Sequence, residues 1–465
     1  MSASPAAERE PGSYRDPSGF IFRRDGVLYR QVSQSFADEW AAFESSGLHA
    51  ALQAKGLLIP DQPAEVELAA EPGAVAVIRP EPISFITYPF EWSFSQLKEA
   101  ALLTLAAQAL AAEHGMTLRD ASAYNVQFLR GRPIMIDTLS FERAAADEPW
   151  KPYRQFCEQF LAPLALMAHR DARLGLLLRT YVDGVPLDLA SELLPRGTRW
   201  SPGLAAHVHL HARAQRQHAD EGRDAAPRAV TMSATRRLAL LDHLRRTIEG
   251  LRLPARGTEW AGYADQTSYS NVATASKEAI VREMLVAIRA KRAWDVGANT
   301  GRYSAIAADA GYEVVALDSD WAAVERHHLA LRKAGEQRIM PLLADLADPS
   351  PAIGWENRER GSLLERANAD VVIALALVHH LAIGRNVPLG MVAELMGRLG
   401  PNLIVEFVPK GDPMARRLLA TREDIFPGYS LEGFRSAFST RFTIVEGRPV
   451  EDSTRVIFRM VRRAP

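Results

Sequence analysis

The sequence predicts an α/β protein in two parts: a helix-covered parallel β-sheet in the carboxyl-terminal half, and a separate α+β domain before it. The chain has 465 residues, of which 47% are hydrophobic, so it is longer than one ordinary domain and can bury two cores. In its second half, short apolar runs alternate with helical segments, which is the pattern of a parallel sheet. One of these runs leads into a helix through a glycine-containing turn.

The expected strands of this sheet follow one another between helices. The fourth is apolar throughout, as a strand covered on both faces should be. Two further β-like segments close the chain and are expected to pair antiparallel. The strands are expected at 292–296, 313–317, 339–344, 370–377 and 402–407, the closing segments at 442–445 and 455–461, and helices at 303–309, 321–334 and 389–399.

The turn after the first strand has the composition of a ligand-binding turn. Gly297 and Gly301 leave room for backbone to approach a ligand, and Asn299 is the non-glycine type that best tolerates positive φ. The glycines are spaced G-x-x-x-G rather than G-x-G-x-x-G, which argues against NAD or FAD. A simpler interpretation remains open, in which the glycines serve only helix–strand packing.

Acidic residues stand at or near the ends of four strands. Asp295 precedes the turn, Asp318 ends the second strand, Asp345 follows the third, and Glu406 lies near the end of the fifth. Ligands of parallel sheets bind at the carboxyl ends of strands, so these side chains are expected around one crevice. A carboxylate in the position of Asp318 can accept hydrogen bonds from both ribose hydroxyls of a nucleoside.

Together these motifs resemble class I S-adenosylmethionine (SAM)-dependent methyltransferases over residues 263–465. The first motif of that family is D/E-x-G-x-G-x-G, and Asn299 stands at its middle glycine. The resemblance implies a Rossmann-like sheet and SAM as the cofactor. It also implies cofactor contacts from Tyr269 in a covering arm, from Asp295, Gly297, Asn299 and Gly301 near the methionine part, from Asp318 at the ribose, and from Asp345 and Leu346 near the adenine.

Candidate catalytic residues follow the fourth strand. His379 and His380 titrate near neutral pH, so either could take a proton from an acceptor hydroxyl or amine, although a structural role for each is equally open. Glu406, with Lys410 and Asp412 in the loop after it, is a candidate for catalysis or acceptor binding. A solvated loop is the alternative for Lys410 and Asp412.

The acceptor class follows from what the sequence lacks. There is no D/N-P-P-Y/F turn after the fourth strand, and the one cysteine, Cys157, lies outside the methyltransferase-like half. The net charge of −1 gives no basic surface for nucleic acid. A small-molecule or lipid-like acceptor is therefore favoured, no nucleic acid is expected, and a protein acceptor stays open.

The first half contains a second spacing of interest. Asp120, Asn125 and Asp137 resemble the catalytic loop and metal-binding aspartate of the protein-kinase-like fold. Arg30 stands where that fold has its strand lysine, Thr138 replaces a glycine, and no glycine-rich phosphate loop is visible. We therefore expect a degenerate binding or docking role rather than phosphoryl transfer, with Mg-ATP as the less favoured ligand. In the alternative interpretation, an unrelated α+β domain uses Asp120 and Asn125 to cap and turn the chain.

The expected boundaries are a disordered tail at 1–16, the α+β domain at 17–218, a linker and connecting helix at 219–262, and the methyltransferase-like domain at 263–465. The histidines around His207 and His211 fit a solvated helix better than a metal site, and we expect no metal. One cysteine, no secretory signal and no apolar stretch long enough to span a bilayer predict a cytoplasmic protein.

Three functions remain after these considerations. The first is a SAM-dependent methyltransferase whose amino-terminal domain recruits or positions the acceptor. The second is a non-catalytic SAM-binding or scaffold protein, and the third is a bifunctional methyltransferase and phosphotransferase. The His-His-Leu run, the E-F-V-P-K loop and the long amino-terminal part also resemble poorly characterised bacterial methyltransferases, some of which are labelled nodulation proteins.

Overall fold

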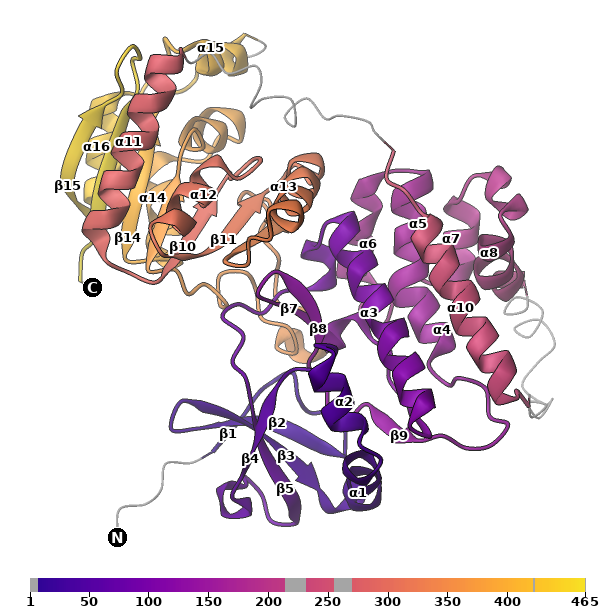
Figure 1. Ribbon diagram of the computed structural model, residues 1–465. Coiled ribbons are helices and arrows are strands. Elements are labelled where there is room, and N and C mark those ends of the chain that lie inside the picture. Colours follow the sequence, from indigo (N-terminus) through magenta and orange to yellow (C-terminus); the bar gives the residue numbers. More distant parts are fainter. Residues whose placement is uncertain (1–6, 214–230, 255–269, 421–422, 465) are drawn as a thin grey trace. The chain divides into compact units, whose positions relative to one another are not determined.

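The computed structural model describes residues 7–213, 231–254, 270–420 and 423–464, and the chain divides into two compact units (Figure 1). The first unit comprises residues 1–255 together with 352–360, and the second comprises 256–351 and 361–465. The sequence predicted an unbroken second domain from residue 263. The short segment 352–360 instead groups with the first unit, because its side chains pack there.

The second unit is built on a seven-stranded sheet, which confirms the predicted α/β class. The strand order is β12-β11-β10-β13-β14-β16-β15. The five strands β10 to β14 run parallel, and β16 and β15 close the sheet antiparallel, as the sequence predicted. The strands are β10 (Arg292–Val296), β11 (Glu313–Asp318), β12 (Ile339–Leu343), β13 (Val371–Ala374), β14 (Asn402–Phe407), β15 (Phe442–Pro449) and β16 (Val456–Arg462).

Helices bury both faces of this sheet. On one face, Ala293, Val314 and Ile373 share a core with α11 and α12. On the other, the Phe434 ring of α16 packs on those of Phe407 and Phe458. The alternation of these strand residues between faces explains why the strands read as continuous apolar runs. The helices are α11 (Asn271–Ile288), α12 (Arg302–Asp309), α13 (Trp321–Ala334), α14 (Leu389–Leu399), α15 (Pro413–Leu419) and α16 (Leu431–Ser439).

Strand β13 is shorter than predicted. The apolar run continues to Leu377, but the strand ends at Ala374. Ala376 has a φ of 50°, in the left-handed region, and its N–H donates to the Glu406 side chain instead of a neighbouring strand. Hydrophobicity alone could not reveal this turn, because its cause is a carboxylate on another strand.

The first unit contains a five-stranded antiparallel sheet in the order β1-β2-β3-β5-β4 and two separate two-stranded pairs, β6 with β9 and β7 with β8. The β7–β8 hairpin turns through Arg130 and Gly131, both at positive φ. The strands are β1 (Glu8–Arg9), β2 (Gly19–Arg24), β3 (Val27–Ser33), β4 (Asp61–Ala64), β5 (Ala74–Pro80), β6 (Met116–Leu118), β7 (Val126–Leu129), β8 (Arg132–Met135) and β9 (Phe141–Arg143).

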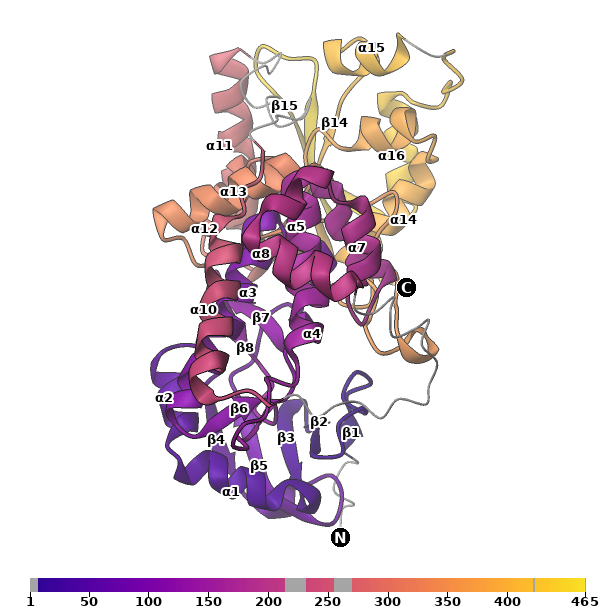
Figure 2. The ribbon, with the colours of Figure 1, turned by 90° about the vertical axis from the view of Figure 1, so that its right-hand side faces the viewer.

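The remaining part of the first unit is helical. Helix α3 starts at a capping box formed by Ser93 and Gln96. The connecting helix α10 lies along α3, where Lys98 donates to the backbone carbonyls of Glu249 and Leu251 (Figures 1 and 2). The helices are α1 (Ala37–Ser45), α2 (Leu48–Ala54), α3 (Phe94–Glu113), α4 (Tyr153–Phe156), α5 (Ala162–His169), α6 (Leu177–Thr180), α7 (Leu187–Leu193), α8 (Pro202–Leu204) and α10 (Ala234–Gly250).

Part of the expected disordered tail is ordered from residue 7 onward. Glu8 and Arg9 pair antiparallel with the edge strand β2, and the Glu10 N–H donates to the Ile21 carbonyl at 2.9 Å. A polar composition did not predict this segment, because backbone pairing with an edge strand needs little apolar surface. Over the described ranges, no helix combines the length and the apolar character that crossing a bilayer requires.

A buried ion pair joins the closing strand to the loop after β14. The Arg455 side chain is 1% exposed and donates to both carboxylate oxygens of Asp412, from Nε at 2.7 Å and from Nη2 at 2.9 Å. Asp412 also caps α15 through the Met414 N–H. The sequence analysis considered a solvated loop for Asp412, whereas the residue is only 5% exposed.

We expect Arg455→Met to destabilise the second unit by about 3–5 kcal/mol, because it leaves buried carboxylates without their cation. The matched control is Lys410→Met, which removes the more exposed ion pair with Asp424 and should cost less than about 1 kcal/mol. Hydrogen exchange of the β14 and β16 amides in increasing urea measures both effects on this unit alone. Equal effects of the two substitutions would contradict the assigned role of Arg455.

Candidate functional site

The turn between β10 and α12 has the backbone shape that its sequence predicted. Gly297, Asn299 and Gly301 all have positive φ, at 80°, 50° and 87°. The N–H groups of Gly297 and Ala298 donate to the Leu317 carbonyl, at 2.8 and 3.0 Å, which fixes the turn against the end of β11. Gly297 is exposed, so its backbone is open to a ligand at the carboxyl end of the sheet.

The two glycines of this turn serve different purposes. A Cβ on Gly301 would lie 2.0 Å from Nε2 of His327 on α13, so helix packing requires a glycine there. A Cβ on Gly297 would lie no closer than 3.4 Å to any neighbouring atom, so its requirement is conformational. The packing interpretation of the glycine pattern therefore holds for Gly301 and not for Gly297.

Asp318 connects this turn to the end of β11. One of its carboxylate oxygens accepts the Asn299 N–H at 2.7 Å, and the other accepts the Asp320 N–H at 2.8 Å. Burial raises the pKa of Asp318 to about 6, yet part of the residue stays exposed. A carboxylate has about four acceptor positions, so these backbone hydrogen bonds leave capacity for a further donor.

Asp295 lies within the sheet rather than in the crevice. It is 2% exposed, and its Oδ2 accepts the Ser304 hydroxyl of α12 at 2.6 Å. Burial raises its pKa to about 6, and the neighbouring Asp318 charge adds to the effect. This hydrogen bond ties the end of β10 to the helix that follows the turn.

The expected adenine-side residues follow β12. Asp345 is half-buried and pairs with Arg385, with Nη2 to Oδ2 at 3.0 Å, while its Oδ1 accepts the Ala347 N–H. Leu346 is 9% exposed. Tyr269, expected in a covering arm, lies outside the described residues.

Glu406 sits at the centre of a buried charge cluster at the carboxyl end of β14. It is 0% exposed and accepts Lys277 Nζ of α11 at 2.7 Å and the Ala376 N–H at 2.7 Å. Arg455 Nη1 lies 3.7 Å from its other oxygen. Sequence reasoning missed Lys277 and Arg455, because one lies in an amphipathic helix and the other before a strand, where charged residues are common.

His379 and His380 stack on each other with ring centroids 4.2 Å apart. His379 is 0% exposed, and neither ring nitrogen has a hydrogen-bond partner among the residues described. Burial lowers its pKa well below the ordinary value, and the charges of His380, Arg455 and Lys277 act in the same direction. Burial also lowers the pKa of His380 to about 4, so both rings are neutral at pH 7.

In the first unit, the three residues of the kinase-like spacing lie on neighbouring segments, but their side chains are engaged. Arg30 of β3 binds Asp137 at 2.5 Å, and Ser140 donates to the same carboxylate. Burial alone would raise the pKa of Asp137, but the Arg30 charge and the Ser140 hydrogen bond lower it. Asp120 accepts from the Ser122 N–H at 2.9 Å and from Gln155 at 2.7 Å, while Asn125 donates to Ser140.

The histidines considered for metal binding form hydrogen bonds with protein groups. His207 Nδ1 lies 2.7 Å from the Tyr153 hydroxyl, and its Nε2 lies 2.8 Å from Nδ1 of His243 on α10. His211 stacks against Tyr153. Far from being solvated, His207 is 3% exposed, because α10 covers it.

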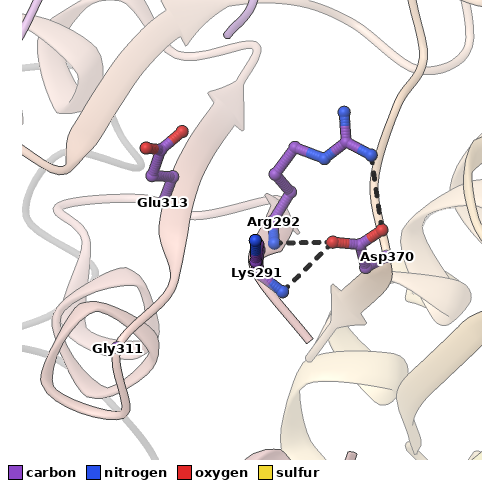
Figure 3. A pocket seen from close by; sticks show the side chains of 5 residues that line it. All are labelled: Lys291, Arg292, Gly311, Glu313 and Asp370. Carbon is purple, nitrogen blue, oxygen red and sulfur yellow. Dashed lines mark hydrogen bonds and ion pairs between the residues drawn. The ribbon is translucent and has the colours of Figure 1, made fainter. Parts of the chain in front are cut away.

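A pocket in the second unit lies at the amino ends of the parallel strands, whereas the site described above lies at their carboxyl ends. It is lined by Lys291, Arg292, Gly311, Glu313 and Asp370, which precede or begin strands (Figure 3). Asp370 accepts the backbone N–H groups of Lys291 and Arg292, at 3.1 and 2.9 Å. These bonds fix the start of β10, and the pocket is separate from the carboxyl-end crevice.

Comparison with known proteins gives partial similarity to solved structures, and no family model matches the chain. The N-methyltransferase NodS from Bradyrhizobium japonicum WM9 is 12% identical, covering 42% of this chain and 99% of that chain with a TM-score of 0.32. Magnesium protoporphyrin IX methyltransferase from Synechocystis PCC 6803 is 17% identical, and the match covers 42% of this chain and 90% of that chain with a TM-score of 0.30. The bifunctional kinase-methyltransferase WbdD is 14% identical, and the match covers 43% of this chain and 42% of that chain with a TM-score of 0.30.

A sequence relative covers almost the whole chain. Nodulation protein NoeA of Rhizobium meliloti strain 1021 is 35% identical over 472 aligned residues, covering 99% of this chain and 98% of its own. The match therefore extends over both units. The chain belongs to the same family as nodulation protein NoeA.

Proposed function

We propose that this protein is a SAM-dependent methyltransferase that acts on a small-molecule or lipid-like acceptor, with the first unit as an accessory domain. The observation that carries the proposal is Asp318, a partly exposed carboxylate at the end of β11 with acceptor capacity beyond its backbone hydrogen bonds. Its position beside the exposed Gly297 turn suits the ribose of a nucleoside. Its backbone hydrogen bonds fix the turn, and its partial exposure leaves the carboxylate accessible to a ligand.

The residues present fit SAM as the cofactor. Gly297 would lie against its methionine part, Asp318 would accept its ribose hydroxyls, and Asp345 and Leu346 would flank its adenine. When bound, SAM supplies an activated methyl group for in-line transfer to a nucleophile. The chain then has to align the acceptor and remove its proton.

His379 is the residue we propose for that proton transfer. Its ring is neutral at pH 7, and neither nitrogen has a partner among the described residues, so one of them can accept a proton. Glu406 is a weaker candidate, since Lys277, the Ala376 N–H and nearby Arg455 all contact its oxygens. We propose that Glu406 positions the turn before His379 rather than acting on the acceptor.

The acceptor class rests on charge and on the relative. A net charge of −1 disfavours a polyanion. The relative's name, nodulation protein, fits a small or lipid-like acceptor better than nucleic acid, and a protein acceptor stays open. We expect the protein to act in the cytoplasm.

We expect Asp318→Ala to weaken SAM binding by about 150-fold or more, because two hydrogen bonds to a charged group contribute about 3 kcal/mol or more. Isothermal calorimetry on the full chain measures the effect. The matched control is Asp309→Ala, an exposed carboxylate at the end of α12. If the unsubstituted protein shows no SAM binding at millimolar concentration, the proposed function is wrong.

The pH dependence of SAM affinity is an independent check on the same carboxylate. Asp318 is ionised above its pKa of about 6 and accepts both hydroxyls, so affinity should be constant there. Below pH 6 protonation removes acceptor capacity, and affinity should fall by up to about tenfold per pH unit. Asp318→Asn should abolish that slope, and an unchanged slope in this variant would contradict the role of Asp318.

We expect His379→Asn to keep SAM affinity within about twofold and to lower methyl transfer by about 100- to 10,000-fold, the usual contribution of a general base. Transfer of a tritiated methyl group from SAM to small-molecule and lipid fractions of a bacterial extract measures it. His380→Asn is the parallel variant. Full turnover by His379→Asn would exclude the base role.

The first unit is not expected to bind Mg-ATP, because Arg30 neutralises the carboxylate that would hold the metal. A thermal-shift titration with ATP and magnesium should therefore leave the melting temperature of the full chain unchanged. A clear shift that Asp137→Asn abolishes would contradict this and support a bifunctional enzyme. Asp61→Asn, at a carboxylate bound to His49, controls for general destabilisation of the unit.

A further inference from the structure

The segment Ala352–Arg360, here called the arm, belongs to the first unit although it connects strands of the second. It forms a small hairpin in which Ile353 and Arg360 exchange two backbone hydrogen bonds, both at 3.0 Å. Gly354 turns the chain with a φ of 82°, and a Cβ there would lie 2.5 Å from the Glu359 carboxylate. The arm is thus a compact structure built around the Glu359 side chain.

Glu359 is held in a site made by the amino-terminal segment. Its side chain is 1% exposed and accepts Arg15 through two parallel bonds, from Nε at 2.7 Å and from Nη2 at 2.8 Å. The Tyr14 hydroxyl donates to it at 3.2 Å, and the Trp355 N–H of the arm at 3.1 Å. Burial would raise the pKa of Glu359, but the Arg15 hydrogen bonds bring it to about 2, so the carboxylate is charged at every physiological pH.

The fit is close at the backbone as well. A Cβ on Gly12 would lie 2.7 Å from the Glu359 carbonyl oxygen, so this position accepts the arm only as glycine. An Arg–carboxylate pair with two parallel bonds adds geometric specificity to charge attraction. Gly12, Tyr14 and Arg15 therefore form a shaped carboxylate site, here called the cradle.

The neighbouring arm residue contacts the loop of the kinase-like spacing. The Arg360 guanidinium lies over the Tyr124 ring, 4.5 Å from its centroid. Tyr124 is 8% exposed and stands between Asp120 and Asn125. A cation over a largely buried ring contributes more than one at an exposed surface.

The base of the arm is anchored in the second unit. The Leu363 N–H donates to the Ser350 carbonyl at 2.9 Å, and Leu363 is 0% exposed. The same connection begins with Asp345 and Leu346, the proposed adenine-side residues. One short stretch of chain therefore has its tip fixed in the first unit and its start at the proposed cofactor site.

We propose that the cradle and Tyr124 form an intramolecular binding site for the arm, and that arm docking and SAM binding stabilise each other. The second part rests on the proposed SAM site. A docked arm limits the conformations of residues 345–351, so less ordering free energy is lost when SAM binds. Coupling of this kind is reciprocal, so SAM strengthens docking by the factor by which docking strengthens SAM binding.

Calorimetry with SAM on the full chain tests the coupling with four proteins: the unsubstituted protein, Arg15→Ala, Glu359→Gln and the double variant. We expect each single variant to weaken SAM binding at least fivefold, and the double variant to be no weaker than either, because both remove one interaction. The matched control is Arg23→Ala on β2, which removes an exposed ion pair with Glu10 and should leave SAM binding unchanged.

The outcomes separate the two proposals. If the unsubstituted protein does not bind SAM, the proposed function fails. If it binds SAM and both single variants bind equally well, the coupling fails while the function stands. Hydrogen exchange at the Ile353 and Arg360 amides reads the stability of the arm hairpin, which docking should increase: we expect protection that rises with SAM and falls in Glu359→Gln, which preserves side-chain shape. Unprotected amides in the unsubstituted protein would overturn the docking site itself.

Discussion

The chain conformation at the carboxyl ends of β13 and β14 depends on one buried side chain, Glu406. Its side chain holds the Ala376 N–H and so ends β13 early, in a left-handed turn that leads to His379. Lys277 and Arg455 supply the positive charge that lets a carboxylate remain ionised without solvent. Burying these charges costs free energy, and apolar residues in their place could also complete the sheet. The cluster makes physical sense where the turn itself has to be held in one conformation.

The same cluster sets the electrostatics around the histidines. Lys277 and Arg455 lower the pKa of His379 in addition to burial, so the ring stays neutral. At the neighbouring strand ends, burial has the opposite effect on acids and raises the pKa of Asp295 and Asp318 to about 6. Burial thus favours the neutral form of the histidines and of the acids alike, and the difference between them is that Asp318 stays partly exposed whereas His379 does not.

The sequence was sufficient for the sheet and for the backbone shape of the turn after β10, because both depend on local patterns. Apolar runs, intervening helices and the Gly297 turn are encoded in neighbouring residues, and the five parallel strands were found in order. The early end of β13, the burial of Asp412 and the role of Lys277 were not predictable in this way. Each depends on a charged partner far away in the chain: Ala376 on Glu406, Asp412 on Arg455, and Lys277 on Glu406.

In the first unit, protein groups engage the carboxylates of the kinase-like spacing. In a metal-dependent phosphotransferase, the aspartate after the hairpin needs free oxygens to bind the metal. Here the oxygens of Asp137 accept hydrogen bonds from Arg30 and Ser140. Glu39 forms a separate ion pair with Arg143. An arginine at position 30 favours the ion pair with Asp137, because a planar guanidinium matches a carboxylate better than a lysine ammonium does. The Asp137 carboxylate is thereby held by protein groups of the same unit. In the same unit, the exposed Arg15 side chain forms two parallel bonds with the buried Glu359 carboxylate, so a segment from between β12 and β13 is held there by an ion pair of specific geometry.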